Sequence, residues 1–473
     1  MTNSQLLKTV LEPAKEVPVM GKWDVAVCGG GPAGCAAAIA SARNGAETLL
    51  IEKDGFSGGA AVSQLVSVIL STNGVDFQGV WHEWIHALRR RNGVSEIRKS
   101  PHVISGTVYP ECIKYAWDEL LKKAGVKILY HSTVSEVLTE ARRIKALFIE
   151  TSAGRRAILA DRVIDCTGDG IVCHKAGVPW EQGDGSSPWA MALTKVFRVG
   201  GAVRPELWPA PDIMAEIEKA LRAAMVRGEF ATPIVREPGR LLNYIRDWAW
   251  ELPGRNQIMS VVSRVLKTDP LDPWQMTRAE QEGRLQAWEA AEVYRRFVPG
   301  CENSYLLDTS NNIGVRSSRR IKGMELVTKK DVLEFRTYPD EVARSSWHID
   351  IWPADSYTKP AVLSGTPDSK KRAVKISKGA YFGIRYGCLL AYGVENLLMA
   401  GRCISAEHIA ESSLRIQQTC MATGQAAGTA AAISLKLGVE SHELKPDILV
   451  RQLEKDRRAV KKYDMIGNNE TGR

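Results

Sequence analysis

A strand, a glycine-rich turn, a helix and a second strand follow one another in residues 23–53, and this order constrains the fold most. The apolar run Val25 to Cys28 enters the turn Gly29-Gly30-Gly31-Pro32-Ala33-Gly34. An alanine-rich stretch follows, and a second apolar run ends in Glu52. In such a unit the glycines allow a tight turn, close approach of the backbone to a pyrophosphate, and close helix–strand packing. The helix start presents free N–H groups to phosphates, and an acid placed like Glu52 accepts both ribose hydroxyls. The pattern predicts a dinucleotide site.

The bulk composition excludes several classes of protein. With 473 residues, 44% hydrophobic and 25% charged, the chain can form two domains with a sizeable core. It has no apolar run of about 18 residues and no apolar signal-peptide core, so we expect no membrane span and a cytoplasmic location. The nine cysteines include no CxxC pair, which predicts reduced thiols, and no metal site is expected. The net charge is +9, but acids separate basic clusters such as 370–372 and 461–462, which favours a solvated surface over a nucleic-acid interface.

Strand and helix patterns change along the chain. Three strand-like runs separated by turn residues predict an antiparallel meander over 126–138, 144–152 and 156–166. Tryptophans become frequent after residue 180, and a long helix is predicted over 276–296. A sheet-like run then returns at 396–399, followed by an alanine- and glycine-rich helix predicted over about 414–436.

These changes predict an α/β fold in which a Rossmann-like dinucleotide-binding domain is interrupted by a second domain. The first domain has a parallel sheet and an antiparallel meander, and the inserted α+β domain binds the substrate. The expected boundaries are 20–180 and 376–440 for the discontinuous domain, 181–375 for the substrate domain, and 441–473 for a C-terminal helix and tail.

Four separate motifs together resemble one known family. They are GGGPAGCAAAIASARNGAETLLIEKDGFSGG, VIDCTGDG, IGVRSSRRIKG and LLMAGRCISAEHIAESSLRIQQTCMATGQAAGTAAA. Their wording and order over most of residues 20–440 are similar to those of FAD-dependent oxidoreductases of the glutathione-reductase type. The chain is also loosely similar to the fumarate reductase and succinate dehydrogenase flavoproteins. The resemblance implies non-covalent FAD, since no histidine lies in 55–67 to form the covalent link that part of the related group has.

The resemblance also implies which residues hold FAD. The pyrophosphate is expected against Gly29, Gly31, Ala33 and Gly34, the ribose against Glu52, and the adenine against Lys53 and the backbone of Val134. Thr167, Gly168 and Asp169 are expected to close the adenine end of the site. The diphosphate and ribityl chain are expected against Gly58, Gly59, Gly401 and Arg402. Arg402 stands where many relatives have an aspartate and cannot accept ribityl hydrogen bonds, so Ser405 or the backbone is expected to accept them.

The last helix is expected to meet the flavin ring. Thr423, Gly424, Gln425 and Ala426 are expected to begin or interrupt that helix. Free N–H groups at a helix start would stabilise negative charge on the reduced ring. The alternative is that these small residues serve close packing of the helix on the sheet, and both uses require the same residue types.

Four side chains are candidates for the chemistry. His408, between the Gly401 turn and the last helix, is expected to move a proton, although an isolated histidine is often structural. Arg415 is expected to hold a substrate carboxylate or, alternatively, to pair with Glu407 or Glu411. The other two candidates are Arg316, of the group Arg316, Arg319 and Arg320, and His348, which shares a strand face with Asp350. Trp352 stands where the family often has a histidine, which argues against a metal or acid–base role for that segment.

The leading prediction is an FAD-dependent oxidoreductase that moves a hydride between a small polar or anionic organic substrate and flavin N5. One alternative is an NAD(P)-dependent dehydrogenase, against which the late TGQAAG helix argues. Another is an FAD-containing RNA-binding or RNA-modifying protein, suggested by the net charge. No second strand–GxGxxG–helix unit is present, so oxygen, a quinone, a carrier protein or a second substrate remain as electron acceptors.

Overall fold

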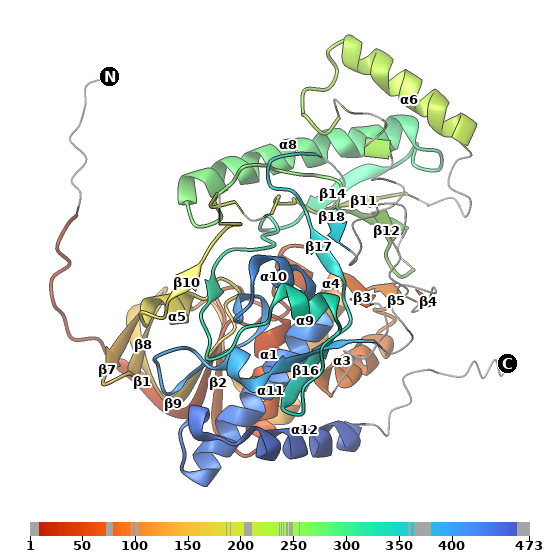
Figure 1. Ribbon diagram of the computed structural model, residues 1–473. Coiled ribbons are helices and arrows are strands. Elements are labelled where there is room, and N and C mark those ends of the chain that lie inside the picture. The colour runs from red at the N-terminus through yellow and green to blue at the C-terminus, as the bar shows by residue number, and fades with distance from the viewer. Residues whose placement is uncertain are drawn as a thin grey trace.

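The largest sheet of the computed structural model has seven strands and combines parallel and antiparallel pairing (Figure 1). Strands β6, β2, β1, β9 and β20 run parallel, and β7, β8 and β9 form an antiparallel meander. The strands are β1 Val19–Cys28, β2 Thr48–Ile51, β6 Lys127–Leu129, β7 Thr133–Glu140, β8 Arg143–Thr151, β9 Gly154–Asp165 and β20 Leu397–Met399. The predicted α/β fold with a parallel sheet and a meander is confirmed. The predicted strand 126–138 is two strands, since His131 adopts a φ of 53° and ends the run between β6 and β7.

The structure describes most of the chain. The described residues are 9–71, 79–95, 98, 99, 104–185, 187–189, 191–202, 211–235, 237, 239, 241, 242, 245, 249–254, 256–357, 361–363 and 380–460. The predicted domain boundary at residue 376, the basic clusters at 370–372 and 461–462, and the tail beyond residue 460 lie outside these ranges.

Two helices pack so closely that their contact depends on glycine. Helix α1, Pro32–Arg43, lies against α11, Gln417–Leu437. A Cβ on Gly424 or Gly428 would lie 2.0 Å from a backbone carbonyl oxygen of α1. The helix predicted over about 414–436 corresponds to α11, which begins at Gln417. A separate helix, α10, His408–Leu414, precedes it. The other helices are α2 Ala60–Ser63, α3 Val80–Arg89, α4 Pro110–Ala124, α5 Ile171–Lys175, α6 Pro211–Val226, α8 Pro273–Phe297, α9 Lys329–Leu333 and α12 Pro446–Val460.

A second lobe lies above the large sheet in Figure 1. It contains α6, the four-stranded sheet β12-β13-β11-β14, and the long helix α8, which begins at Pro273 because Asp272 accepts the N–H groups of Trp274 and Gln275. Its hydrophobic core is separate from that around the large sheet. The strands of this lobe and of the smaller sheets are β3 Val68–Ser71, β4 Arg98–Lys99, β5 Ile104–Thr107, β10 Trp180–Glu181, β11 Phe197–Gly200, β12 Ala249–Glu251, β13 Gln257–Ser260, β14 Tyr305–Thr309, β15 Arg320–Ile321, β16 Glu341–Ser345, β17 Ile349–Ile351, β18 Ala361–Leu363 and β19 Phe382–Arg385.

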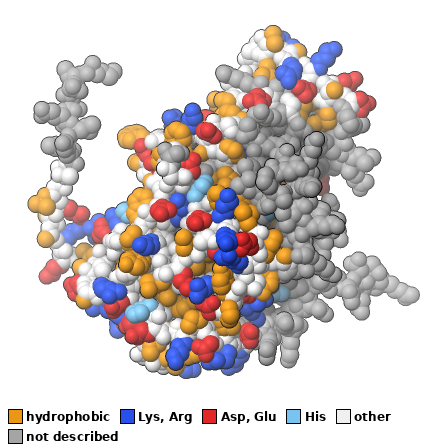
Figure 2. Space-filling view, in the orientation of Figure 1, with side chains coloured by type: hydrophobic (Ala, Val, Ile, Leu, Met, Phe, Trp, Pro, Cys, Tyr) orange, Lys and Arg blue, Asp and Glu red, His pale blue; other side chains and the backbone are white. Residues whose placement is uncertain are grey.

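The surface carries both signs of charge. Figure 2 shows lysine and arginine side chains interspersed with acidic ones on the face in view. None of the helices in the described ranges combines the length and hydropathy that a membrane crossing needs.

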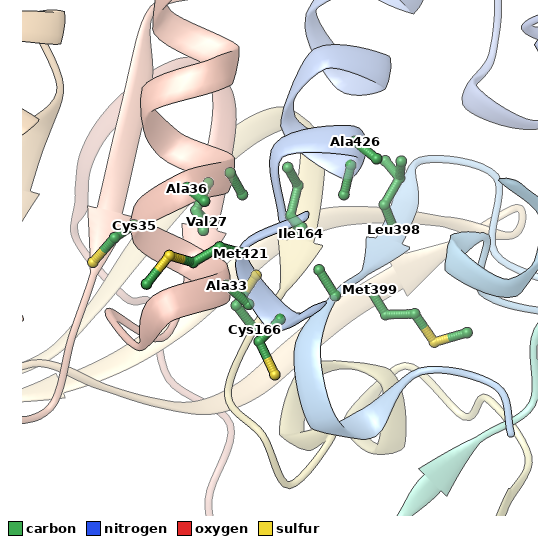
Figure 3. Packing of buried hydrophobic residues seen from close by; sticks show 14 of the residues in the cluster. Val27, Ala33, Cys35, Ala36, Ile164, Cys166, Leu398, Met399, Met421 and Ala426 are labelled. Atoms are coloured by element: carbon green, nitrogen blue, oxygen red, sulfur yellow. The ribbon is translucent and has the colours of Figure 1, made fainter. Parts of the chain in front are cut away.

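Part of the hydrophobic core combines alanines and cysteines with larger apolar side chains. Figure 3 shows α1 and α11 meeting over the parallel strands. The labelled residues of this layer are Val27, Ala33, Cys35, Ala36, Ile164, Cys166, Leu398, Met399, Met421 and Ala426. All nine cysteines are buried free thiols, as the absence of a CxxC pair predicted.

Candidate functional site

A long cavity opens at the carboxyl ends of four parallel strands. Gly29 after β1, Glu52 after β2, Cys166 after β9 and Ala400 after β20 all line it. Ligands of open α/β sheets bind at this edge. The cavity continues from these strand ends to a chamber whose wall includes Trp347, Trp352, Arg316 and Arg415. Of the residues predicted to hold the cofactor, the wall includes Gly29, Gly31, Ala33, Glu52, Lys53, Gly59, Thr167, Gly168, Asp169, Gly401 and Arg402.

The turn at residues 29–31 leaves room for a ligand to approach the protein backbone. Gly29 has a φ of 100°, and a Cβ there would lie 2.6 Å from the carbonyl oxygen of Cys166. A Cβ on Gly31 would meet only the Cα of Gly59, at 3.9 Å. Among the described residues no side chain caps the start of α1, and Gly31, Pro32 and Ala33 of this start line the cavity. Gly34 does not line the cavity; a Cβ there would lie 1.8 Å from the Gly29 oxygen, so it serves helix–strand packing.

Glu52 is held in place by the backbone. One carboxylate oxygen accepts the N–H of Gly30, and the other accepts that of Asp54 at 2.8 Å. The side chain is 7% exposed, and burial raises its pKa, which the two N–H donors oppose. Since each carboxylate oxygen can accept two hydrogen bonds, lone pairs remain for hydroxyl groups in the cavity.

Arg402 is paired inside the protein. Its Nη2 lies 2.6 Å from an oxygen of Asp169, and its Nη1 donates to Ser318 Oγ at 2.9 Å. Ser318 donates in turn to the same Asp169 oxygen at 2.6 Å. This network fixes the wall beside Gly401. Ser405, expected as the ribityl partner, is buried elsewhere, and its N–H donates to the oxygen of Cys388.

The start of α11 faces the cavity, six residues before the predicted position. Ile416, the residue before the helix, provides no side-chain cap, and Gln417, Gln418 and Cys420 line the wall. Gln417 donates to the oxygens of Val66 and Val68. The amide oxygen and nitrogen of Gln418 are buried and have no hydrogen-bond partner among the described residues. A buried amide is usually hydrogen-bonded, so a water or a ligand atom in the cavity would complete the contacts of Gln418.

The other predicted flavin contacts lie away from the wall. Thr423 is inside α11 and accepts the N–H of Gly401, and Gln425 accepts the N–H of Val80 at 3.1 Å. The expectation that the helix begins or breaks at 423–426 is wrong, because α11 is continuous from Gln417. The remaining off-wall positions are Gly424 and Ala426, which pack in the α1–α11 layer, Gly58, whose N–H donates to the Gly30 oxygen, and Val134, which is buried in β7.

Positively charged side chains lie around the chamber. Arg415 donates to the carbonyl oxygen of Asp350 at 2.8 Å and lies 3.3 Å from its carboxylate, so its partner is Asp350 rather than Glu407 or Glu411. The guanidinium groups of Arg316 and Arg264 each lie 4.5 Å from the ring centre of Trp352. Arg316 donates to the Ala192 oxygen at 2.6 Å. Burial, then Arg415 and Arg264, lower the pKa of Arg316 to about 9.

The two histidines do not line the cavity. Burial and Arg320 lower the pKa of His408, whose Nδ1 has no hydrogen-bond partner among the described residues. His348 lies against Trp347 with ring centres 4.3 Å apart and the ring planes tilted by 30°, and burial lowers the pKa of His348. The structure therefore brings Arg415 and Arg316 to the chamber and leaves His408 and His348 behind its wall.

Glu411 is a buried acid whose setting the sequence did not indicate. It accepts the Ser317 hydroxyl at 2.6 Å and lies 3.8 Å from Arg320, and its Oε1 has no hydrogen-bond partner in the described part of the chain. Burial raises the pKa of Glu411 to about 7, although the hydrogen bond from Ser317 and the neighbouring arginines act to lower it. The sequence feature that drew attention to Glu411 was its position four residues before Arg415, about one helical turn away. Among the described residues no three possible metal ligands cluster.

The wall fits an extended dinucleotide with a ring at one end. The glycine cradle and the α1 start suit a pyrophosphate, Glu52 suits a ribose, and the unpartnered amide of Gln418 at the α11 start suits the polar edge of a ring system.

Comparisons with known proteins identify a family that matches the chain. A family profile described as FAD dependent oxidoreductase matches residues 24–455. A search of curated protein sequences found no match. Solved structures that resemble the chain include a geranylgeranyl bacteriochlorophyll reductase-like protein from Thermoplasma acidophilum, with 14% identity, 94% of this chain and 88% of that chain covered, and a TM-score of 0.42. p-Nitrophenol 4-monooxygenase PnpA from Pseudomonas putida has 12% identity, with 94% of this chain and 87% of that chain covered and a TM-score of 0.44. The flavin-dependent brominase Bmp2 has 11% identity, with 91% of this chain and 83% of that chain covered and a TM-score of 0.47.

The family match covers both the glycine turn and the late helix, and it decides between the two cofactors in favour of FAD over NAD(P). The chain belongs to the FAD-dependent oxidoreductase family.

Proposed function

We propose that this enzyme exchanges a hydride between flavin N5 and a small organic anion held in the arginine chamber. The observation that carries the proposal is the continuity of one cavity from the FAD-type cradle at Gly29 and Glu52 to the guanidinium groups of Arg316 and Arg415. FAD, when bound, supplies the hydride exchange, and the protein supplies orientation, charge and proton handling.

The chain's own residues divide these tasks. Arg316 has no ion-pair partner among the described residues, so its charge is available to a substrate anion. Arg415 keeps a buried Nε without a partner in the described part of the chain, while its Nη2 is committed to Asp350. The α11 start at Gln417 and Gln418 presents N–H groups and the positive end of a helix dipole, which stabilise negative charge at the ring's edge.

Asp350 is the proposed proton acceptor for the substrate. It lines the chamber, whereas His408 and His348 do not, and Arg415 keeps its carboxylate oriented at 3.3 Å. A general base must reach the reacting proton directly or through one water, which favours Asp350 over the first candidate, His408.

The protein regions divide accordingly. We propose that 20–180 and 376–440 hold FAD and that 181–375 supplies most of the chamber. The separate hydrophobic core formed mainly by residues 191–301 supports an inserted domain, while residues 321–349 pack in the core of the large sheet.

Anaerobic flavin bleaching tests the proposal. Purified FAD-loaded enzyme is mixed with panels of hydroxy acids, amino acids, enoates and neutral sugars, and flavin absorbance is followed. We expect bleaching by organic acids, or reoxidation of photoreduced enzyme by unsaturated acids. Asp350→Asn and Arg415→Met should slow the reaction at least tenfold, and Arg284→Met, an exposed control on α8, should not. Equal bleaching by neutral sugars, or full activity in Arg415→Met, would contradict the proposal.

A further inference from the structure

One wall of the chamber is a continuous apolar surface at the junction of the two lobes. Leu65, Val68, Val196, Leu252 and Met259 form a small hydrophobic cluster. Four further side chains pack on it and face the cavity: Val66, Leu70, Trp250 and Val261. The wall therefore joins residues in or next to β3 and β12, the residue before β11, and residues at the end of β13 and just after it.

Beyond this wall, apolar groups continue toward the arginines. Val315, Ile416, Trp347 and Trp352 all line the chamber. The faces of Trp352 lie near two guanidinium groups, and Trp347 is covered by His348. Trp352 therefore stabilises the position of the two guanidinium groups through its ring faces.

Two neutral donors on this part of the wall are committed to the protein, whereas Thr194 Oγ1 and Gln417 Oε1 are buried without a hydrogen-bond partner among the described residues. Gln417 donates to two backbone oxygens, and the Ser63 hydroxyl donates to the Gly59 oxygen. A substrate with several hydroxyl groups needs a partner for each, because a buried hydroxyl without a hydrogen bond costs roughly 1–3 kcal/mol. The chamber offers charge at one place and apolar surface around it.

We infer that the substrate is an amphiphilic organic anion, with an apolar body against the Val68–Val196–Trp250 wall and one anionic group on Arg316 and Arg415. The inference rests on the proposed function, which leaves the body of the anion undefined. It narrows the substrate class from small polar molecules to hydrophobic monoanions such as aryl or alkenyl carboxylates.

Three probes separate the contributions of body and charge. 1-Naphthoate has an apolar body and a carboxylate, 1-naphthalenemethanol has the same body without charge, and gluconate has a carboxylate on a polar body. Each is titrated into the oxidised FAD-loaded enzyme, and binding is followed by perturbation of the flavin spectrum and by tryptophan fluorescence. We expect 1-naphthoate to bind at least tenfold more tightly than either other probe.

Variants locate the two parts of the site. Arg316→Met should weaken 1-naphthoate binding roughly 10–100-fold, the scale of a charged hydrogen bond, and leave 1-naphthalenemethanol within twofold. Arg316→Lys keeps the charge and should retain part of the binding. Val68→Thr adds a hydroxyl at nearly constant volume and should weaken 1-naphthoate three- to tenfold without weakening gluconate. Arg284→Met serves as the control.

The outcomes separate this inference from the proposed function. If gluconate binds as tightly as 1-naphthoate and both depend on Arg316, the anion site stands and the apolar body is refuted. If 1-naphthalenemethanol binds as tightly as 1-naphthoate, the anionic group is refuted. If no carboxylate perturbs the flavin, the proposed function fails together with the inference.

Discussion

Replacing Glu411 by glutamine should stabilise the protein at alkaline pH. Glu411 is 0% exposed, and only Ser317 donates a hydrogen bond to it in the described part of the chain. Arg320 lies 3.8 Å away, too far to hydrogen-bond. Burial outweighs these groups and raises the pKa from 4.5 to about 7. Glutamine keeps the acceptor for Ser317 and cannot ionise.

The sign of the pH dependence follows from which state binds the proton more tightly. Below the unfolded-state pKa the carboxyl is protonated in both states, so it contributes no difference. Between that value and about 7 the unfolded protein ionises while folded Glu411 does not, and stability falls as pH rises. The loss between about pH 5 and pH 8.5 amounts to roughly 2.5 kcal/mol, at 1.36 kcal/mol per unit of pKa shift. Glu411→Gln removes this loss.

Urea unfolding in excess FAD, followed by tryptophan fluorescence at about pH 5 and about pH 8.5, measures the effect. The stability of Glu411→Gln relative to the parent should rise by roughly 2.5 kcal/mol between the two pH values. Glu47→Gln, which removes an exposed carboxylate, should show no such change. A difference that is the same at both pH values, or that favours the parent at alkaline pH, would show that Arg320, Arg402 and Arg415 keep Glu411 ionised and would refute the reasoning.

Four further predictions concern the cofactor and its surroundings. Glu52→Gln should weaken FAD binding by about 1–3 kcal/mol, measured by equilibrium flavin fluorescence; unchanged affinity would exclude Glu52 as the ribose ligand. Gly424→Ala places a Cβ 2.0 Å from the Ala33 oxygen and should lower unfolding stability by about 1–3 kcal/mol in urea; an unchanged midpoint would argue against close α1–α11 packing. His408→Gln should change anaerobic flavin reduction less than about threefold, while Arg415→Met slows it at least tenfold; the reverse order would restore His408 as the base. Acid precipitation should release FAD into the supernatant, and flavin in the pellet would indicate a covalent link.

The nucleotide end of the cavity was predictable because the residues that line it lie close together in the sequence. Gly29, Gly31 and Glu52 lie within 24 residues of one another, and their roles follow from a turn, a helix start and a strand end. Each of these has a short sequence pattern. The meander and the return of the chain at β20 were predictable for a similar reason, since alternating and apolar runs mark strands whatever their partners are.

The chamber was not predictable, because its residues are brought together only by tertiary packing. Trp352 and Arg264 are 88 positions apart, and their contact depends on how β17 meets the second lobe, to which β13 belongs. The sequence pointed to Arg415 but gave Glu407 or Glu411 as its ion-pair partner, since helical spacing considers only neighbours on one helix. The partner is Asp350, from β17.

The placement of the last helix shows how a small shift reassigns function. The sequence predicted that the helix begins or breaks at residues 423–426 and that these small residues lie beside the flavin. In the structure α11 begins at Gln417, and the small residues pack against α1. In the structure the residues of this helix that line the cavity include Gln417 and Gln418, whose polar groups no composition rule would single out. Two requirements meet on this helix: its first turn must present N–H groups to the cavity, and its next turns must be small enough to lie on α1. The start of α11 is thereby fixed by the glycine contacts behind it, so a change at Gly424 should disturb the cofactor site as well as the core.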